Sequence, residues 1–76
     1  MFGKGAKLHG HPTVRREHRR LHALRQLYAL LDWCEQHDVA CGVATPAEDA
    51  PERDVRRRIR RVRRALAQHG VAAPAI

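Results

Sequence analysis

Apolar residues recur at spacings of three and four over residues 13–37, which is the period of an amphipathic α-helix. The repeating positions are Leu21, Leu24, Tyr28 and Leu31, and the stripe is widened by Leu27, Leu30 and Cys34. Pro12 beside Thr13 is typical of a helix start, with Thr13 as the N-cap. The pattern predicts one long helix over about residues 13–37, with Tyr28 and Cys34 in the core.

A second helix is predicted over about residues 51–69. Its apolar residues follow one another at spacings of four, three and four, as Val55, Ile59, Val62 and Leu66. This spacing is a narrow heptad seam, so the helix can bury only one edge. Pro51 suits the first position of a helix, and Gly70 suits the left-handed residue that follows its last turn.

The segment between the two helices is predicted to be a connection with one helical turn. Gly42 suits a left-handed conformation, and Thr45-Pro46-Ala47-Glu48 has the spacing of a capping box, which predicts a turn over 46–50. We therefore expect an all-α fold, with two main antiparallel helices in a single domain over residues 13–71. The two apolar stripes also allow a four-helix dimer.

The two ends of the chain carry no apolar period. Residues 1–12 hold three Gly, two Lys and two His, and we expect a flexible basic tail there. Residues 72–76 are small, include Pro74, and are expected to be disordered. A core drawn from the remaining residues of this 76-residue chain should supply only about 3–5 kcal/mol, which favours an obligate partner, either a second copy or the ligand.

Charge is segregated along the chain, whose formal net charge is +7. Residues 1–31 carry seven basic and one acidic side chain, residues 32–54 one basic and seven acidic, and residues 55–76 seven basic and none acidic. Thirteen of the fifteen cations are Arg, which binds phosphate bidentately. Basic faces attract polyanions, so the predicted partner is nucleic acid.

Arginine fills most of the second predicted helix outside its apolar seam. No acid follows Asp54, so like charges stand at i and i+4, and each such pair costs about 0.2–0.5 kcal/mol in an isolated helix. A polyanion would neutralise them; the alternatives are a solvated face or docking on the acidic residues 32–54. Arginines in the first turns of the first helix likewise oppose the helix dipole. The predicted nucleic-acid-binding residues are Arg56, Arg57, Arg60, Arg61, Arg63, Arg64, Arg15, Arg16, Arg19 and Arg20.

The order of long helix, capped turn and the run Arg53-Asp54-Val55-Arg56-Arg57-Arg58-Ile59-Arg60-Arg61-Val62 resembles helix-turn-helix proteins in shape. A recognition helix in those proteins turns an apolar edge to its own core and polar side chains outward. The composition of the same run is also similar to the arginine-rich helices of small RNA-binding phage regulators. The first resemblance implies a helix-turn-helix-like arrangement, and together they leave DNA and RNA both open.

The histidines and cysteines do not form a convincing metal or catalytic motif. Cys34, His37 and Cys41 give a loose C-x2-H-x3-C, and His18 and His22 stand at i, i+4, whereas structural zinc needs four ligands in paired spacings. Cys34 and His37 share one helix turn, which seldom gives a nucleophile–base geometry, and no Gly-rich phosphate loop accompanies them. We expect no metal, no cofactor, no catalytic residue and no enzymatic activity.

Three functions remain open for a chain of this kind. The first is a non-enzymatic nucleic-acid-binding regulator of transcription, of the size that phages and mobile elements encode. The second is an interaction protein that docks on a host nucleic-acid machine, such as RNA polymerase or a nuclease complex, and modulates it. The third is a structural ribonucleoprotein or virion component. The residues predicted for a protein interface, including one between two copies, are Trp33, Val55, Ile59, Val62 and Leu66.

The sequence also gives an expectation for the compartment. Residues 1–10 lack the apolar segment of a secretory signal, and no stretch is long enough to span a membrane. We therefore expect a cytoplasmic protein with reduced thiols at Cys34 and Cys41, and neither a membrane nor a small-molecule substrate as a partner.

Overall fold

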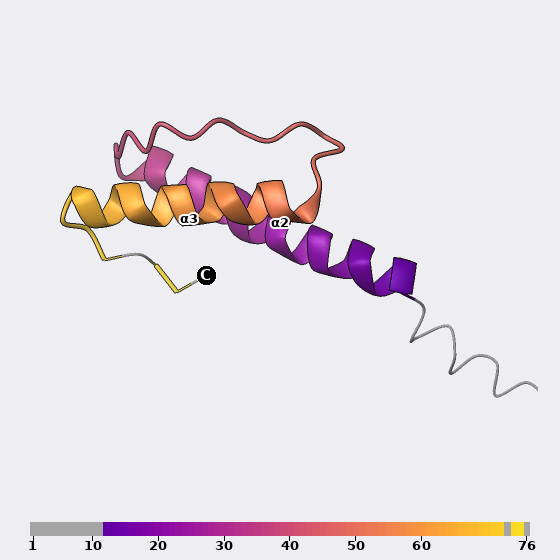
Figure 1. The fold of residues 1–76 in the computed structure, drawn as a ribbon. Helices are drawn as coiled ribbons and strands as arrows, with labels where there is room; N and C mark the ends of the chain where they lie inside the picture. The colour runs from indigo at the N-terminus through magenta and orange to yellow at the C-terminus, as the bar shows by residue number, and fades with distance from the viewer. Residues whose placement is uncertain (1–11, 73, 76) are drawn as a thin grey trace, which may run out of the picture.

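The computed structural model describes residues 12–72, 74 and 75, and its regular structure is two α-helices (Figure 1). α2 spans Pro12–Gln36 and α3 spans Glu52–Gln68, and residues 37–51, here called the connector, join them. Within this part of the chain the predicted all-α class is confirmed, and both helices end within one residue of the predicted bounds. Residues 1–11 of the tail predicted over 1–12, and residues 73 and 76 of the predicted disordered C-terminus, lie outside the described residues, whereas Pro12 belongs to α2.

The two helices point in the same direction. In Figure 1 both run from right to left, and the connector carries the chain back along their length. Contacts between the helix starts agree, because Arg19 lies 3.8 Å from Glu52 and Arg20 donates to the Ala50 carbonyl at 2.6 Å. The predicted antiparallel pairing is therefore wrong. An extended connector reaches at most about 3.3–3.6 Å per residue, which is ample for returning along some 16 residues of helix at about 1.5 Å each.

The turn predicted over residues 46–50 is present as a single hydrogen-bonded turn at residues 47–50, and it is not helical. It is closed by the Ala50 N–H, which donates to the Ala47 carbonyl at 3.0 Å. Pro51 disfavours helical geometry at Ala50 and cannot donate a further bond, so the turn does not propagate. Gly42 has the predicted left-handed conformation, with φ of 68°. The connector is also far longer than the turn of about 3–4 residues in helix-turn-helix proteins, so that predicted arrangement is not formed.

α2 ends in a Schellman motif, in which a left-handed residue lets two amides bond back to the last turn. The Val39 N–H donates to the Cys34 carbonyl at 2.8 Å, and the Asp38 N–H donates to the Glu35 carbonyl at 3.3 Å. Asp38 takes the left-handed conformation, with φ of 56°, in the position where glycine is usual. The start of α2 also differs from the prediction, because the helix begins at Pro12 and Thr13 lies within it.

α3 ends in the same motif, here with the glycine that the sequence predicts. The Val71 N–H donates to the Leu66 carbonyl at 2.9 Å, and the Gly70 N–H donates to the Ala67 carbonyl at 3.0 Å. Gly70 has φ of 72°, a conformation that costs glycine little because it has no Cβ. Val71 then packs against the core, as is common for the residue after the left-handed position.

The core lies between the two helices and is closed by the connector. Its buried residues are Ala23, Leu27, Leu30 and Cys34 of α2, Ala50, and Val55, Ile59, Val62 and Leu66 of α3. The α3 seam is apolar and buried as predicted, but it is buried against α2 of the same chain. The four seam residues are therefore unavailable as the predicted interface, and a four-helix dimer through this seam would require the fold to open.

Part of the predicted core stripe of α2 stays on the surface. Val14, Leu21 and Tyr28 remain 50%, 46% and 47% exposed, and we call these three residues the apolar stripe. Their spacing of seven residues places them nearly in line along the helix. The predicted burial of Tyr28 is wrong because α2 is apolar on two faces, and α3 covers the face that carries Ala23 and Leu27. Neither described helix is both long and apolar enough to cross a membrane.

Candidate nucleic-acid interface

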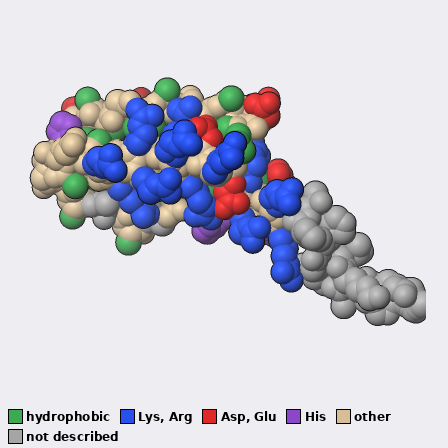
Figure 2. Space-filling view, in the orientation of Figure 1, with side chains coloured by type: hydrophobic (Ala, Val, Ile, Leu, Met, Phe, Trp, Pro, Cys, Tyr) green, Lys and Arg blue, Asp and Glu red, His purple; other side chains and the backbone are tan. Residues whose placement is uncertain are grey.

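The arginines of α3 lie on the side of the helix that faces away from the core. Because successive residues turn by about 100°, a seam at spacings of four, three and four leaves the opposite side to the remaining positions. Figure 2 shows Lys and Arg side chains, in blue, spread along this side of the molecule. We call the following exposed residues the arginine face: Arg53, Arg57, Arg60, Arg61, Arg63 and Arg64.

None of these six arginines has an ion pair or hydrogen bond with another described residue. All of the acids of α3, Glu52 and Asp54, lie in its first turn, where the helix dipole favours them. Like charges therefore face one another at i and i+4, as at Arg57 and Arg61, without an intervening carboxylate. The arginine face is a cationic surface that the described fold leaves without counter-charge.

The other two arginines of α3 are engaged within the chain. The Arg56 Nε donates to the Glu52 carboxylate, and the Arg58 Nε donates to the Asp54 carboxylate at 3.2 Å. Arg58 also donates to the Ala44 carbonyl at 2.9 Å, which ties α3 to the connector. The predicted phosphate contact Arg56 thus has a competing carboxylate beside it. Both ion pairs could have been predicted from the sequence, because each acid stands four residues before its arginine on the same helix.

Arg53 belongs to the arginine face although it was absent from the predicted set. It is exposed, and no described residue pairs with it, whereas its neighbour Glu52 holds Arg56. Its place one turn before Arg57 aligns it with the centre of the face. The signal that could have found it is the same helical spacing that identified Arg57 and Arg64.

Arg15, Arg16 and Arg19 continue the cationic surface beyond the start of α3, and we call them the N-terminal patch. All three are exposed. The Arg19 Nε lies 3.8 Å from the Glu52 carboxylate, and its side chain is still 62% exposed. Because the helices are parallel, the N-terminal patch and the start of the arginine face meet at one end of the molecule. The structure thus joins two predicted basic segments that are some 40 residues apart in sequence.

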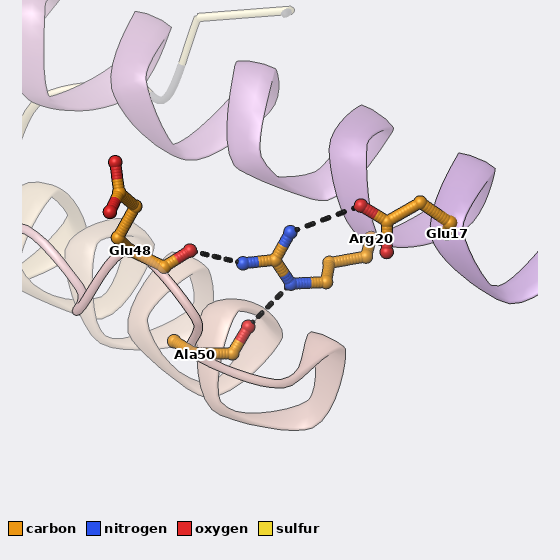
Figure 3. A network of polar contacts seen from close by, with 4 residues as sticks. All are labelled: Glu17, Arg20, Glu48 and Ala50. Carbon is orange, nitrogen blue, oxygen red and sulfur yellow. Dashed lines mark hydrogen bonds and ion pairs between the residues drawn. The ribbon is translucent and has the colours of Figure 1, made fainter.

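Arg20, which was also predicted to bind phosphate, is committed to the fold. Its Nε donates to the Ala50 carbonyl at 2.6 Å, a second guanidinium nitrogen donates to the Glu48 carbonyl, and the third lies 3.5 Å from the Glu17 carboxylate (Figure 3). The side chain is only 16% exposed. Arg20 therefore fastens the connector to α2, and its guanidinium is not free to bind phosphate as predicted.

Trp33, predicted as an anchor for a protein partner, is half-buried and packs against the core. Its ring stacks on His37, with centroids 4.0 Å apart and an angle of 16° between the planes. The His37 Nδ1 also lies 2.8 Å from the Trp33 carbonyl oxygen. Much of the Trp33 surface is thus used within the chain, and Tyr28 is the aromatic residue that α2 leaves exposed.

The thiol of Cys34 is buried in the core, and Cys41 lies beside it. Burial raises the pKa of the Cys34 thiol, and the neighbouring Cys41 raises it further through electrostatics and a hydrogen bond. A raised pKa keeps Cys34 protonated near neutral pH, whereas the thiolate is the nucleophile and metal ligand. Between residues 12 and 75, no three His, Cys, Asp or Glu side chains of the described set are grouped to hold a metal ion.

Comparisons of the chain with protein-family models, with curated proteins and with solved structures find no match. Function must therefore be inferred from the chemistry of the surface. The largest feature available for that inference is the arginine face with the N-terminal patch beside it.

Proposed function

We propose that this protein is a non-enzymatic nucleic-acid-binding regulator whose arginine face contacts phosphate. The observation that carries the proposal is that six exposed arginines on one side of α3 have no acidic partner in the described chain. Guanidinium groups bind phosphate oxygens bidentately, and an anion would relieve the repulsion between neighbours such as Arg57 and Arg61. The N-terminal patch supplies a second set of phosphate contacts at the same end of the molecule.

The test is fluorescence anisotropy of labelled duplex DNA, single-stranded DNA and an RNA hairpin, titrated with the full chain across a salt series. Binding that neutralises about four to eight phosphates gives a log–log salt slope of about −4 to −7 on duplex DNA. Arg61→Gln and Arg63→Gln, on the two flanks of the arginine face, should each reduce that slope by about one, since each removes one phosphate contact. Glutamine keeps a helix propensity close to that of arginine, so α3 should stay folded.

Arg25→Gln is the matched control for these substitutions. Arg25 is exposed and pairs with no other residue that the structure describes, but it lies on the side of α2 that faces away from the core and from α3. The same loss of one positive charge at this position should leave the salt slope nearly unchanged. An equal effect of all three substitutions would show that only net charge matters, and a slope unchanged in every variant would contradict phosphate binding by the arginine face.

A second candidate function is docking on a protein of a host nucleic-acid machine, and the apolar stripe favours it. Leu21 and Tyr28 are large apolar residues that the fold leaves uncovered on a face of α2 distinct from the arginine face. Val14 and Leu21 line a shallow open depression together with Glu17 and His18. Binding to a purified host polymerase or nuclease complex that survives high salt, and is lost on Leu21→Gln and Tyr28→Gln, would support this function.

A further inference from the structure

The charged surface also bears on which nucleic acid the protein recognises. We propose that the partner is double-stranded DNA and that α3 lies in its major groove, an inference that rests on the proposed function. Three properties of the described residues carry it: the width of the arginine face around α3, its length along the helix axis, and the position of the aromatic side chains.

The arginine face is wide. At about 100° per residue, its six members cover an arc of about 160° around the helix axis, from Arg63 on one side through Arg57 to Arg61 on the other. A single row of phosphates needs only a narrow stripe of cations. Arginines on both flanks of a helix can instead reach phosphates on both sides of it, which is the arrangement that the two walls of a groove present.

The dimensions of α3 fit the groove of B-form DNA. Arg53 to Arg64 is a run of 12 residues, and its 11 steps of about 1.5 Å give about 16 Å of helix. A helix with its side chains is about 10–12 Å across, and the B-DNA major groove is about 12 Å wide and 8.5 Å deep. The corresponding groove of A-form RNA is too narrow and deep for side chains to read. Only one edge of α3 is buried, so most of its circumference is free to enter.

No aromatic side chain of the described residues lies on the arginine face, where it could stack on the bases of a single-stranded nucleic acid. Proteins that hold single-stranded nucleic acid interleave cations with exposed aromatic rings, on which the bases stack. The two described aromatic residues, Tyr28 and Trp33, both belong to α2, and α3 has none. Trp33 packs against the core and on His37, while Tyr28 lies on the apolar stripe. The arginine face therefore offers contacts to phosphate and no stacking platform.

The N-terminal patch extends the same interface. Arg15 and Arg16 precede the level at which α3 begins, because Arg19 is the residue of α2 that meets Glu52. With α3 in the groove, these side chains would reach the phosphate backbone beside it. At the centre of the arginine face, Arg57 and Arg64 point away from the core and would face the base edges, where arginine binds guanine O6 and N7 bidentately. The expected readout is a modest preference for guanine-containing sites.

The test compares a duplex DNA, its single strand and a duplex RNA of the same sequence and length, bound by the full chain at fixed ionic strength. Duplex DNA is expected to bind at least about tenfold more tightly than either alternative. Dimethyl sulfate, which methylates guanine N7 in the major groove, should react less at guanines in the bound duplex. Arg57→Gln/Arg64→Gln should abolish this protection, whereas Arg25→Gln should preserve it, with circular dichroism confirming that both variants are helical.

The outcomes separate this inference from the proposed function. Equal or tighter binding to the RNA duplex or to the single strand, with a steep salt slope, would overturn the duplex-DNA inference and leave nucleic-acid binding intact. Tight binding to duplex DNA that leaves N7 reactivity unchanged, or that a minor-groove ligand displaces, would overturn the placement of α3 in the major groove. No salt-dependent binding to any of the three would overturn both proposals.

Discussion

Arg20 of α2 bonds to two backbone carbonyls of the connector, and Arg20→Met isolates the contribution of these bonds to stability. Methionine keeps the unbranched apolar stem and has a similar helix propensity, but it lacks all of the guanidinium donors. The substitution removes the Arg20 Nε donor, which lies 2.6 Å from the Ala50 carbonyl oxygen. Because Ala50 is only 5% exposed, water cannot readily replace that donor. The substitution also releases the Glu48 carbonyl and the Glu17 carboxylate, both of which water can reach.

These contacts set the expected magnitude. A hydrogen bond from a charged donor contributes about 1.5–3 kcal/mol, and the more exposed Glu17 pair adds about 0–1 kcal/mol. We expect Arg20→Met to lower the free energy of unfolding by about 2–4 kcal/mol. Because a core of this size supplies only about 3–5 kcal/mol, this loss would leave a free energy of unfolding of about −1 to 3 kcal/mol, so the variant should be at best marginally stable near room temperature.

Urea denaturation followed by far-ultraviolet circular dichroism measures this loss. Arg16→Met is the matched control, since Arg16 is exposed, pairs with no described residue and lies one turn earlier on the same helix. Its cost should be within about 0.5 kcal/mol. Arg20→Lys should fall between the two, because an ammonium group cannot span both carbonyls as the planar guanidinium does. Equal stability of Arg20→Met and Arg16→Met would refute the conclusion that Arg20 fastens the connector.

Three further predictions concern the core and the helix ends. Leu66→Ala should lower the free energy of unfolding by about 2–5 kcal/mol because Leu66 is fully buried between α3 and α2; denaturation with little loss would mean that the seam is not packed in the single chain. Asp38→Gly should raise it by about 0.5–1 kcal/mol, since glycine adopts the left-handed conformation without strain, and a lower melting temperature would contradict that assignment. The raised pKa of Cys34 favours the folded state while the thiol is protonated, so this stability should be present in full below the ordinary pKa of a free thiol, about 8.5, and be lost as pH rises above it. Cys34→Ala should flatten that pH dependence in urea titrations; an unaltered dependence would place its origin in other groups.

The sequence by itself determined the local structure, because local structure depends on spacings within a few residues. The period of three and four fixed both helices to within one residue of their observed ends. Gly70 marked the end of α3, and the regular positions of Val55, Ile59, Val62 and Leu66 identified the edge that α3 buries. The same periodicity placed the arginines opposite that edge, so most of the arginine face was predictable from helical spacing alone.

Only the tertiary structure decided how these elements meet. An apolar stripe indicates which face a helix buries, but it does not indicate whether the neighbouring helix runs parallel or antiparallel. In addition, α2 carries two apolar faces, and α3 covers only one of them. That choice buried Leu27 and left Tyr28 exposed. The direction of α3 follows from the extended connector and from the bonds of Arg20 to it, which join residues about 30 positions apart and have no local signature.

The residues of the candidate site likewise include some whose partners follow from local spacing and others whose partners depend on the tertiary structure. The pairs Glu52–Arg56 and Asp54–Arg58 follow from i, i+4 spacing and could have been predicted from sequence alone. The commitment of Arg20 to the connector could not, because a structural arginine and a phosphate-binding arginine are identical as letters. The difference is whether the guanidinium already donates its hydrogen bonds to carbonyls or carboxylates of the folded chain. Those acceptors come within reach only when segments distant in sequence are brought together.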